Sequence, residues 1–474
     1  MIPTHRPHRC LFRRVVCALR KSLLVALFAS GLATADARTA GAGSQEISLD
    51  RDQSIHFGRH LLAQGRADIA FALARALVEA DAGDAEALIL LAAALQAQGQ
   101  DEAARAAARE AHRHATDDQQ RFEAAMLAGR ADYRRGAHTR AQWWVRRAAH
   151  AAPDAEARAT AERNFAHVRR ENPLELSFSF GLAGSSNINQ GSSTDTVEVF
   201  GLPFQLDGAA QALSGTEFAL DTGLRYRIAQ TDRSATTLSA GLSARAYRLS
   251  SEARAQAPEA RNSDYAFQSL EVGVSHRFTA GPGEAVHEIA GTVGRSWYGG
   301  AALSDFARID LSRATALNPR TGLRFTLTAQ RQERRDSAAR SSTTLGVQTD
   351  VNHTFESGAR LQATAALRET RAESTDVRHS AQRAQLTYVM AEPVAGVRLS
   401  STLGLERRRY PAHMLAPEGR RDLRGRIGLS ASFEEIEYMG FSPSLNLDIA
   451  RTRSNVPIHE RRSVDLFMGI ASRF

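Results

Sequence analysis

EFALDTGLRYRI, residues 217–228, places apolar side chains at every second position for most of its length, with charged or polar ones between them. Leu220 and Leu224 fall on one face, while Asp221 and Arg225 fall on the other. A period of two is typical of a β-strand with one apolar and one polar face. The same alternation recurs in residues 270–278, 323–329 and 423–433. The stretch therefore predicts a sheet whose two faces meet different surroundings.

The alternation extends on both sides of this stretch, from residue 174 to the end of the chain. Its segments are mostly 13–16 residues long, whereas strands of soluble proteins are usually about 5–6 residues long. Charges on one face of strand after strand are typical of a transmembrane β-barrel. We expect an even number of strands, fourteen, near 174–188, 215–229, 235–249, 264–279, 285–298, 304–317, 321–335, 341–354, 359–372, 377–390, 394–410, 420–433, 440–453 and 461–474.

The lengths of the connections between strands favour a barrel that the chain enters and leaves on the periplasmic side. The longer connections, 189–214, 250–263 and 411–419, all follow odd-numbered strands. Connections after even-numbered strands, such as 230–234 and 318–320, are short. Short periplasmic turns and longer external loops are the arrangement of outer-membrane barrels.

The last strand carries a signal of its own. Residues 463–474 read SVDLFMGIASRF and end on an aromatic residue. A final amphipathic strand with a terminal aromatic is similar to the assembly signal of bacterial outer-membrane proteins. The residues of this predicted barrel assembly signal are Val464, Leu466, Met468, Ile470 and Phe474.

Residues 48–170 have a different period and predict a helical domain. Apolar residues recur at helical spacing there. Glycine recurs at 65, 99 and 136, and aspartate at 84, 118 and 154. These spacings of 34–37 residues resemble tetratricopeptide (TPR) helix pairs, with each glycine in a turn and each aspartate capping a helix. We expect a TPR-like α-helical solenoid of pairs near 50–81, 84–114 and 118–151, closed by a helix at 154–170; an ordinary helical bundle is the alternative.

The N-terminus predicts export from the cytoplasm. Residues 1–21 are basic and residues 22–35 are apolar and uncharged. This order is typical of a secretory signal peptide, here residues 1–37, with cleavage after Ala35 or Ala37; a short membrane anchor is the alternative. Residues 38–47 are predicted to be a linker, 48–170 a periplasmic helical domain and 171–474 a barrel in the cell outer membrane.

Composition argues against enzymes and nucleic-acid binders. Most of the net charge of +8 lies before residue 37, so nucleic-acid binding is not indicated. Cys10 and Cys17, the only cysteines, precede the apolar run. His56 and His60 lack the glutamate of an HExxH zinc motif and are interpreted as a solvated helix face. We expect no catalytic residue, no metal and no cofactor.

The whole arrangement resembles the surface lipoprotein assembly modifier (Slam) family. Ser185–Ser186–Asn187–Ile188–Asn189–Gln190, at the end of the first strand, is similar to the segment that opens that family's barrel. Ser454–Asn455–Val456, before the last strand, is similar as well. The resemblance implies a non-enzymatic outer-membrane factor that moves surface lipoproteins or related secreted proteins to the cell surface. Its partners would be that client protein, the outer-membrane assembly machinery and the lipid bilayer. A porin-like channel and a TPR–barrel polysaccharide exporter are the alternatives.

Two groups of residues are candidates for function. Trp143 and Trp144 are adjacent on a predicted helix, so one can pack inward while the other is exposed to a client; core packing is the alternative. Asn187 and Asn189 are candidates for the lumen or the seam between the first and last strands, with ordinary turn formation as the alternative. Glycine weakens strand pairing, so the seam candidates include Gly181, Gly184 and Gly469. The sequence leaves open whether a client passes through the lumen or the seam.

Overall fold

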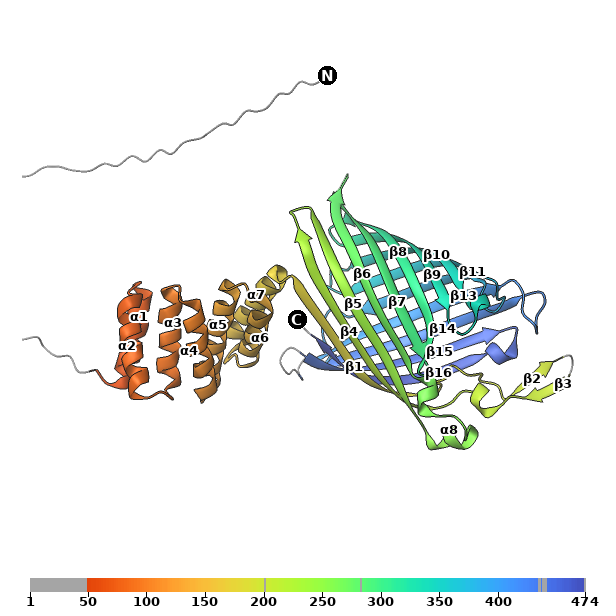
Figure 1. The fold of residues 1–474 in the computed structure, drawn as a ribbon, viewed down its shortest axis with the longest axis horizontal. Helices are drawn as coiled ribbons and strands as arrows, with labels where there is room; N and C mark the ends of the chain where they lie inside the picture. The colour runs from red at the N-terminus through yellow and green to blue at the C-terminus, as the bar shows by residue number, and fades with distance from the viewer. Residues whose placement is uncertain (1–48, 200–201, 282–283, 434–435, 437–440, 473–474) are drawn as a thin grey trace, which may run out of the picture. The chain divides into compact units, whose positions relative to one another are not determined.

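The computed structural model describes residues 49–474 except 200–201, 282–283, 434–435, 437–440 and 473–474 (Figure 1). The predicted signal peptide, the predicted linker and Phe474 lie outside the described residues. No helix within the described ranges is both long and apolar enough to cross a lipid bilayer.

Three helix pairs and a closing helix form the N-terminal part of the described chain, as predicted. Gly65, Gly99 and Gly136 form the turns inside the pairs, at φ of 75°, 77° and 72°. Glycine adopts this left-handed backbone without steric cost, which explains its recurrence. The helices are α1 (Arg51–Ala63), α2 (Ala67–Ala80), α3 (Ala85–Ala97), α4 (Asp101–His114), α5 (Asp118–Arg134), α6 (His138–His150) and α7 (Ala155–Glu171).

Aspartates cap four of these helices, α1, α3, α5 and α7, but one prediction is wrong by a residue. The Asp84 carboxylate accepts hydrogen bonds from the amides of Glu86 and Ala87 at 3.0 and 3.1 Å. The cap of α5 is Asp117 rather than Asp118, and it accepts from the amide of Gln120 at 2.8 Å. Asp117 has the extended backbone that lets a side chain turn back onto the first free amides. Asp118 already lies inside the helix.

The helical core is built mainly from alanine. Ala104, Ala108 and Ala128 are at most 1% exposed and lie in one cluster with Trp144 and Phe165. Small side chains let the helix axes approach closely, and the two aromatic side chains supply most of the apolar area.

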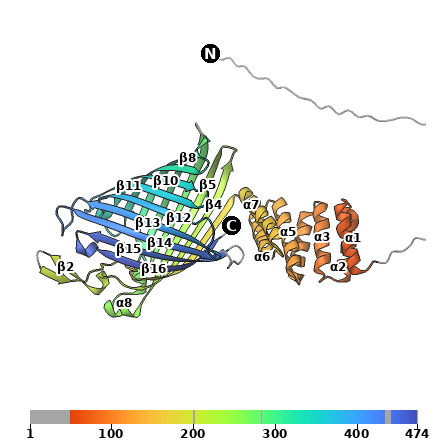
Figure 2. The same ribbon diagram turned by 180° about the vertical axis from the view of Figure 1, so that it is seen from behind.

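Fourteen antiparallel strands close into a barrel, which confirms the predicted fold class. β1 completes the closure by pairing with both β4 and β16 (Figures 1 and 2). The observed bounds agree with the predicted ones to within three residues. The strands are β1 (Leu174–Ser185), β4 (Gly215–Gln230), β5 (Ser234–Leu249), β6 (Phe267–Ala280), β7 (Ala285–Tyr298), β8 (Ala301–Asn318), β9 (Thr321–Arg334), β10 (Ser342–Thr354), β11 (Arg360–Ala372), β12 (His379–Val389), β13 (Val397–Tyr410), β14 (Arg420–Phe433), β15 (Phe441–Ser454) and β16 (Arg461–Ser472).

The longer connections lie together at one end of the barrel, here called the loop end; the opposite end is the turn end. The loops contain elements that alternation alone did not predict. They are the hairpin β2 (Thr196–Val199) and β3 (Leu202–Gln205), the short helix α8 (Ser251–Gln256), and the 3₁₀ turns η1 (Gly208–Ala210), η2 (Asn262–Tyr265), η4 (Ala338–Arg340) and η5 (Pro457–His459).

The two faces of the barrel strands differ as the sequence predicts. On the outward face of β4, Phe218, Leu224 and Ile228 are 39%, 40% and 52% exposed. On the inward face, Arg245 lies 3.3 Å from Glu217 and 3.0 Å from Asp221. An exposed apolar belt outside and paired charges inside are the properties of a barrel that spans a membrane.

Candidate functional site

The seam between β1 and β16 is paired over only part of its length. β1 pairs with β4 from Leu174 to Ser185, but with β16 only from Gly181 to Ser185. Within the described part of β16, which ends at Ser472, no residue pairs with residues 174–180 of β1, so the described pairing across the seam lies at the loop end. Backbone groups left without partners in lipid are costly, so this edge is a site where another extended segment gains hydrogen bonds by binding.

An aromatic side chain lies on the inner face of the barrel at the paired part of the seam between β1 and β16. A Cβ atom added to Gly181 would overlap the Phe467 ring, and one added to Gly469 would lie 2.6 Å from the same ring. The absence of side chains at the two glycines thus makes room for Phe467 across the seam, an arrangement known to support pairing at glycine. Gly184, by contrast, has nothing within 4 Å of an added Cβ.

The difference between Gly181 and Gly184 predicts that a valine at each position has a different effect on barrel stability. Gly181→Val should destabilise the barrel by about 1–3 kcal/mol because the new side chain displaces the Phe467 ring. Gly184→Val adds the same side chain on the same strand without a clash and should have little effect. The measurement is the urea midpoint at which the folded, heat-modifiable band is lost on gels. Equal midpoints for the two variants would contradict the packing described here.

The candidate asparagines lie just beyond β1, because the strand ends at Ser185 rather than at the predicted residue 188. The Asn187 side chain donates to the carbonyls of Gly191 at 3.0 Å and Arg462 at 3.2 Å. It therefore forms a turn and also crosses the seam to β16. Asn189 donates to the carbonyls of Ala209 and Gln211 at 2.9 and 2.7 Å, and so joins the two ends of the loop 189–214.

Further bonds fasten this loop to the start of β16. The amide of Ser193 donates to the carbonyl of Glu460 at 2.8 Å, and the Arg461 guanidinium donates to Gln190 at 3.4 Å. On the other side of β16, the Asn455 side chain donates to the carbonyl of Gly419 at 2.9 Å. The first of the two short segments that carried the family resemblance thus acts as a clasp at the loop end of the seam, and the second fastens the connection between β15 and β16 to the start of β14.

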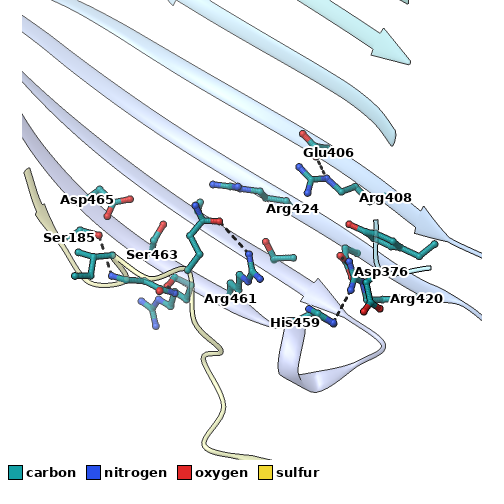
Figure 3. A pocket seen from close by; sticks show the side chains of 18 of the residues that line it. Ser185, Asp376, Glu406, Arg408, Arg420, Arg424, His459, Arg461, Ser463 and Asp465 are labelled. Carbon is teal, nitrogen blue, oxygen red and sulfur yellow. Dashed lines mark hydrogen bonds and ion pairs between the residues drawn. The ribbon is translucent and has the colours of Figure 1, made fainter. Parts of the chain in front are cut away.

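This clasp borders a charged cavity of about 550 Å³ inside the loop end of the barrel (Figure 3). Asn187, a candidate for the lumen or the seam, is one of its lining residues. The sequence analysis proposed no role for the charged side chains of the cavity, which come from strands and loops far apart in the chain. The charged and imidazole side chains that line it are Glu217, Arg340, Asp376, Glu406, Arg408, His413, Arg420, Asp422, Arg424, His459, Arg461 and Asp465. Arg462 borders it with its backbone carbonyl, which accepts the Asn187 hydrogen bond.

Arg420 is the central side chain of this cavity and is only 5% exposed. Its guanidinium carbon lies 3.5 Å from the centre of the Tyr410 ring, a cation–π contact. Its Nη1 donates to Nε2 of His459 at 2.7 Å. Burial and the neighbouring Arg420 charge lower the pKa of His459 to about 4. The imidazole is therefore neutral near pH 7 and accepts the arginine hydrogen bond.

The predicted assembly signal lies on the outward face of β16. Val464, Leu466, Met468 and Ile470 are 36%, 49%, 57% and 53% exposed. They form a continuous apolar stripe that runs along the paired part of the seam, where Leu466 and Met468 face Gly184 and Leu182 of β1. Their role as a signal remains a prediction.

The two tryptophans of α6 have different surroundings. Trp144 is 7% exposed and packs edge-on against His112, whereas Trp143 is 49% exposed. The Arg147 guanidinium carbon lies 4.7 Å from the centre of the Trp143 ring. Of the two tryptophans, Trp144 packs in the core, and Trp143 therefore remains the candidate for contact with a client.

The described residues contain no cluster of three or more metal-ligating side chains. The cavity instead pairs arginines with carboxylates, as in the Arg408–Glu406 and Arg420–Asp422 pairs. This arrangement holds strands and loops together and offers charge to a bound or passing group.

Known proteins place the chain in a family. An outer membrane channel from Pseudomonas putida F1 is 10% identical, with 62% of this chain and 95% of that chain covered, at a TM-score of 0.29. The type III secretion translocator chaperone SycD of Yersinia enterocolitica is 18% identical over 26% of this chain and 86% of that chain, at a TM-score of 0.24. Scores this low carry no argument about function. No curated protein matches the sequence at a significant level. Residues 175–474, well over half of the chain, match the model described as surface lipoprotein assembly modifier. The chain therefore belongs to the surface lipoprotein assembly modifier family.

Proposed function

We propose that this protein delivers surface lipoproteins, or related secreted proteins, to the cell surface without catalysing a reaction. The proposal places the helical domain, residues 48–170, in the periplasm and the loop end of the barrel outside the cell. Family membership supports an assembly role in the outer membrane. The outer-membrane assembly machinery would insert the barrel by recognising its last strand.

The observation that carries the proposed route is the half-paired seam. Residues 174–180 of β1 pair with no described residue of β16 at the turn end, which the proposed orientation puts next to the periplasm. An extended client segment can add to such an edge by β-augmentation. Widening the seam from this end then requires breaking the residue pairs that join Gly181–Ser185 to β16, the two hydrogen bonds between Ser186 and Val464, and the bonds that fasten the loop 189–214 to β16.

The helical domain would hold the client before it reaches the barrel. Aromatic side chains contribute strongly to binding at protein interfaces, and Trp143 is both exposed and oriented by Arg147. A solenoid of three helix pairs offers a modest concave surface, so we expect weak, reversible binding that permits transfer.

Removal of residues 51–171 tests this function. Cells producing the shortened protein should keep normal barrel levels but show far less lipoprotein at the surface. Protease shaving of intact cells, with released lipoproteins quantified by mass spectrometry, measures this for every surface lipoprotein at once. Trp143→Ala should partly reduce the amount of lipoprotein at the cell surface. Phe57→Ala, which removes another exposed aromatic side chain of the helical domain, should leave that amount unchanged.

A porin predicts a different outcome for the same experiment. Deletion of the helices would then leave small-solute permeability intact, and no lipoprotein would lose surface exposure. If shaving detects no change in either the shortened protein or a full deletion, the delivery function is wrong.

A further inference from the structure

Six arginines gather on the outward face of the barrel at its loop end. All six are exposed and lie on four consecutive strands, β13 to β16. Their outward direction follows from the register, because they alternate with exposed apolar residues of the same strands. This arginine patch consists of Arg407, Arg409, Arg421, Arg451, Arg453 and Arg462.

The register places like charges opposite one another. Arg409 faces Arg421 across β13 and β14, and Arg451 faces Arg462 across β15 and β16. Like charges directly opposite destabilise a sheet. Within the described ranges, no carboxylate lies within 4 Å of any of the six guanidinium groups. Glu369 and Glu418 line the same hollow as Arg407, Arg409 and Arg421, but they form no ion pair with these arginines. The patch is therefore a concentration of positive charge whose guanidinium groups have no directly paired anion among the described residues.

Arginines elsewhere on the same face show the contrast. At a similar level, Arg295 pairs with Asp305 at 2.5 Å and Arg331 pairs with Glu333 at 2.7 Å. On its outward face, the barrel thus places carboxylates beside the arginines of β7 to β9 and none within ion-pair distance of the six arginines of β13 to β16. An external anion is the missing partner on that side.

The position of the patch identifies where this anion lies. Arg407 faces Leu423, which is 45% exposed, and the next outward residue of β13 is Leu405, 53% exposed. The patch therefore begins where the apolar belt ends, at the level of lipid headgroups. Guanidinium groups bind phosphate through two parallel hydrogen bonds. A soluble acidic protein would have to displace lipid to reach this surface.

We propose that the arginine patch binds the phosphate groups of lipid A, the phosphorylated glycolipid anchor of lipopolysaccharide. The inference rests on the orientation in the proposed function, which puts the loop end in the outer leaflet. Bound lipid would neutralise Arg451 and Arg462 beside the seam and fix this side of the barrel in the membrane.

The test measures lipid binding by the full-length protein in detergent. Native mass spectrometry counts purified lipid A bound to the wild type and to the triple variant Arg451→Gln, Arg453→Gln, Arg462→Gln. Each basic group near an anionic lipid surface contributes about a fivefold gain in affinity. The triple variant should therefore bind lipid A on the order of 100-fold more weakly. Heat-modifiability on gels confirms that its barrel is folded.

The matched control is Arg225→Gln, Arg277→Gln, Arg324→Gln, which removes three inward-facing arginines and changes the net charge equally. It should bind lipid A as the wild type does. Equal binding by both triple variants would overturn the proposal. Equal binding of phosphatidylglycerol and lipid A by the wild type, or displacement of lipid A by a polyglutamate peptide, would also overturn it. Because no client is present, failure here leaves the delivery function standing.

Discussion

Deletion of residues 461–474 should leave almost no assembled barrel in the outer membrane. β16 pairs with β15 from Arg461 to Ser472 and with β1 at the loop end of the seam. Its loss exposes two strand edges whose backbone groups find no partners in lipid. It also removes the predicted assembly signal. The measurement is the amount of heat-modifiable protein in the outer-membrane fraction.

A deletion of comparable size outside the barrel serves as the control. Residues 196–205 contain the hairpin β2–β3 and pair with no barrel strand. Their removal should leave barrel assembly close to normal. Normal barrel levels after loss of 461–474 would show that neither closure nor recognition depends on the last strand.

The fold was largely predictable because local periodicity decides it. The alternation in residues 217–228 reports a strand with lipid on one side and a polar lumen on the other, and the structure places those faces accordingly. The turn glycines of the helical domain were predictable for a related reason. Each adopts a positive φ that other residues rarely accept.

Errors arose where side chains compete with the backbone. The end of β1 was predicted three residues too late because Asn187 and Asn189 continue the polar–apolar alternation. Their amide groups instead bond to loop carbonyls and draw the chain out of the strand. Asp117 and Asp118 are adjacent, and only the backbone conformation decides which of them caps the helix.

The candidate site was less predictable because it depends on contacts that are distant in sequence. Arg420 and His459 are 39 positions apart, and β1 meets β16 across almost the whole barrel domain. No local pattern shows that this pairing stops at Gly181. The arginine patch was missed because charges were expected on one face of each strand, whereas at the loop end arginine also follows the apolar belt on the outward face.

A disulfide across the seam should stop client delivery while leaving the barrel assembled. Leu182 faces Met468 of β16 and also Phe218 of β4. Leu182→Cys with Met468→Cys therefore locks the seam, and Leu182→Cys with Phe218→Cys locks the firmly paired side. Directly paired residues of antiparallel strands lie at a Cα separation that a disulfide accepts. The chain has no cysteine after Cys17, so no other barrel thiol competes.

The locked seam provides the most direct test of the account. Surface lipoprotein is measured by protease shaving of intact cells that carry each cysteine pair, before and after a mild reductant. The account predicts that the Leu182–Met468 pair abolishes the shaved lipoprotein signal, that reduction restores it, and that the Leu182–Phe218 pair leaves it unchanged throughout. Undiminished lipoprotein delivery through a barrel whose seam disulfide has formed would contradict the account.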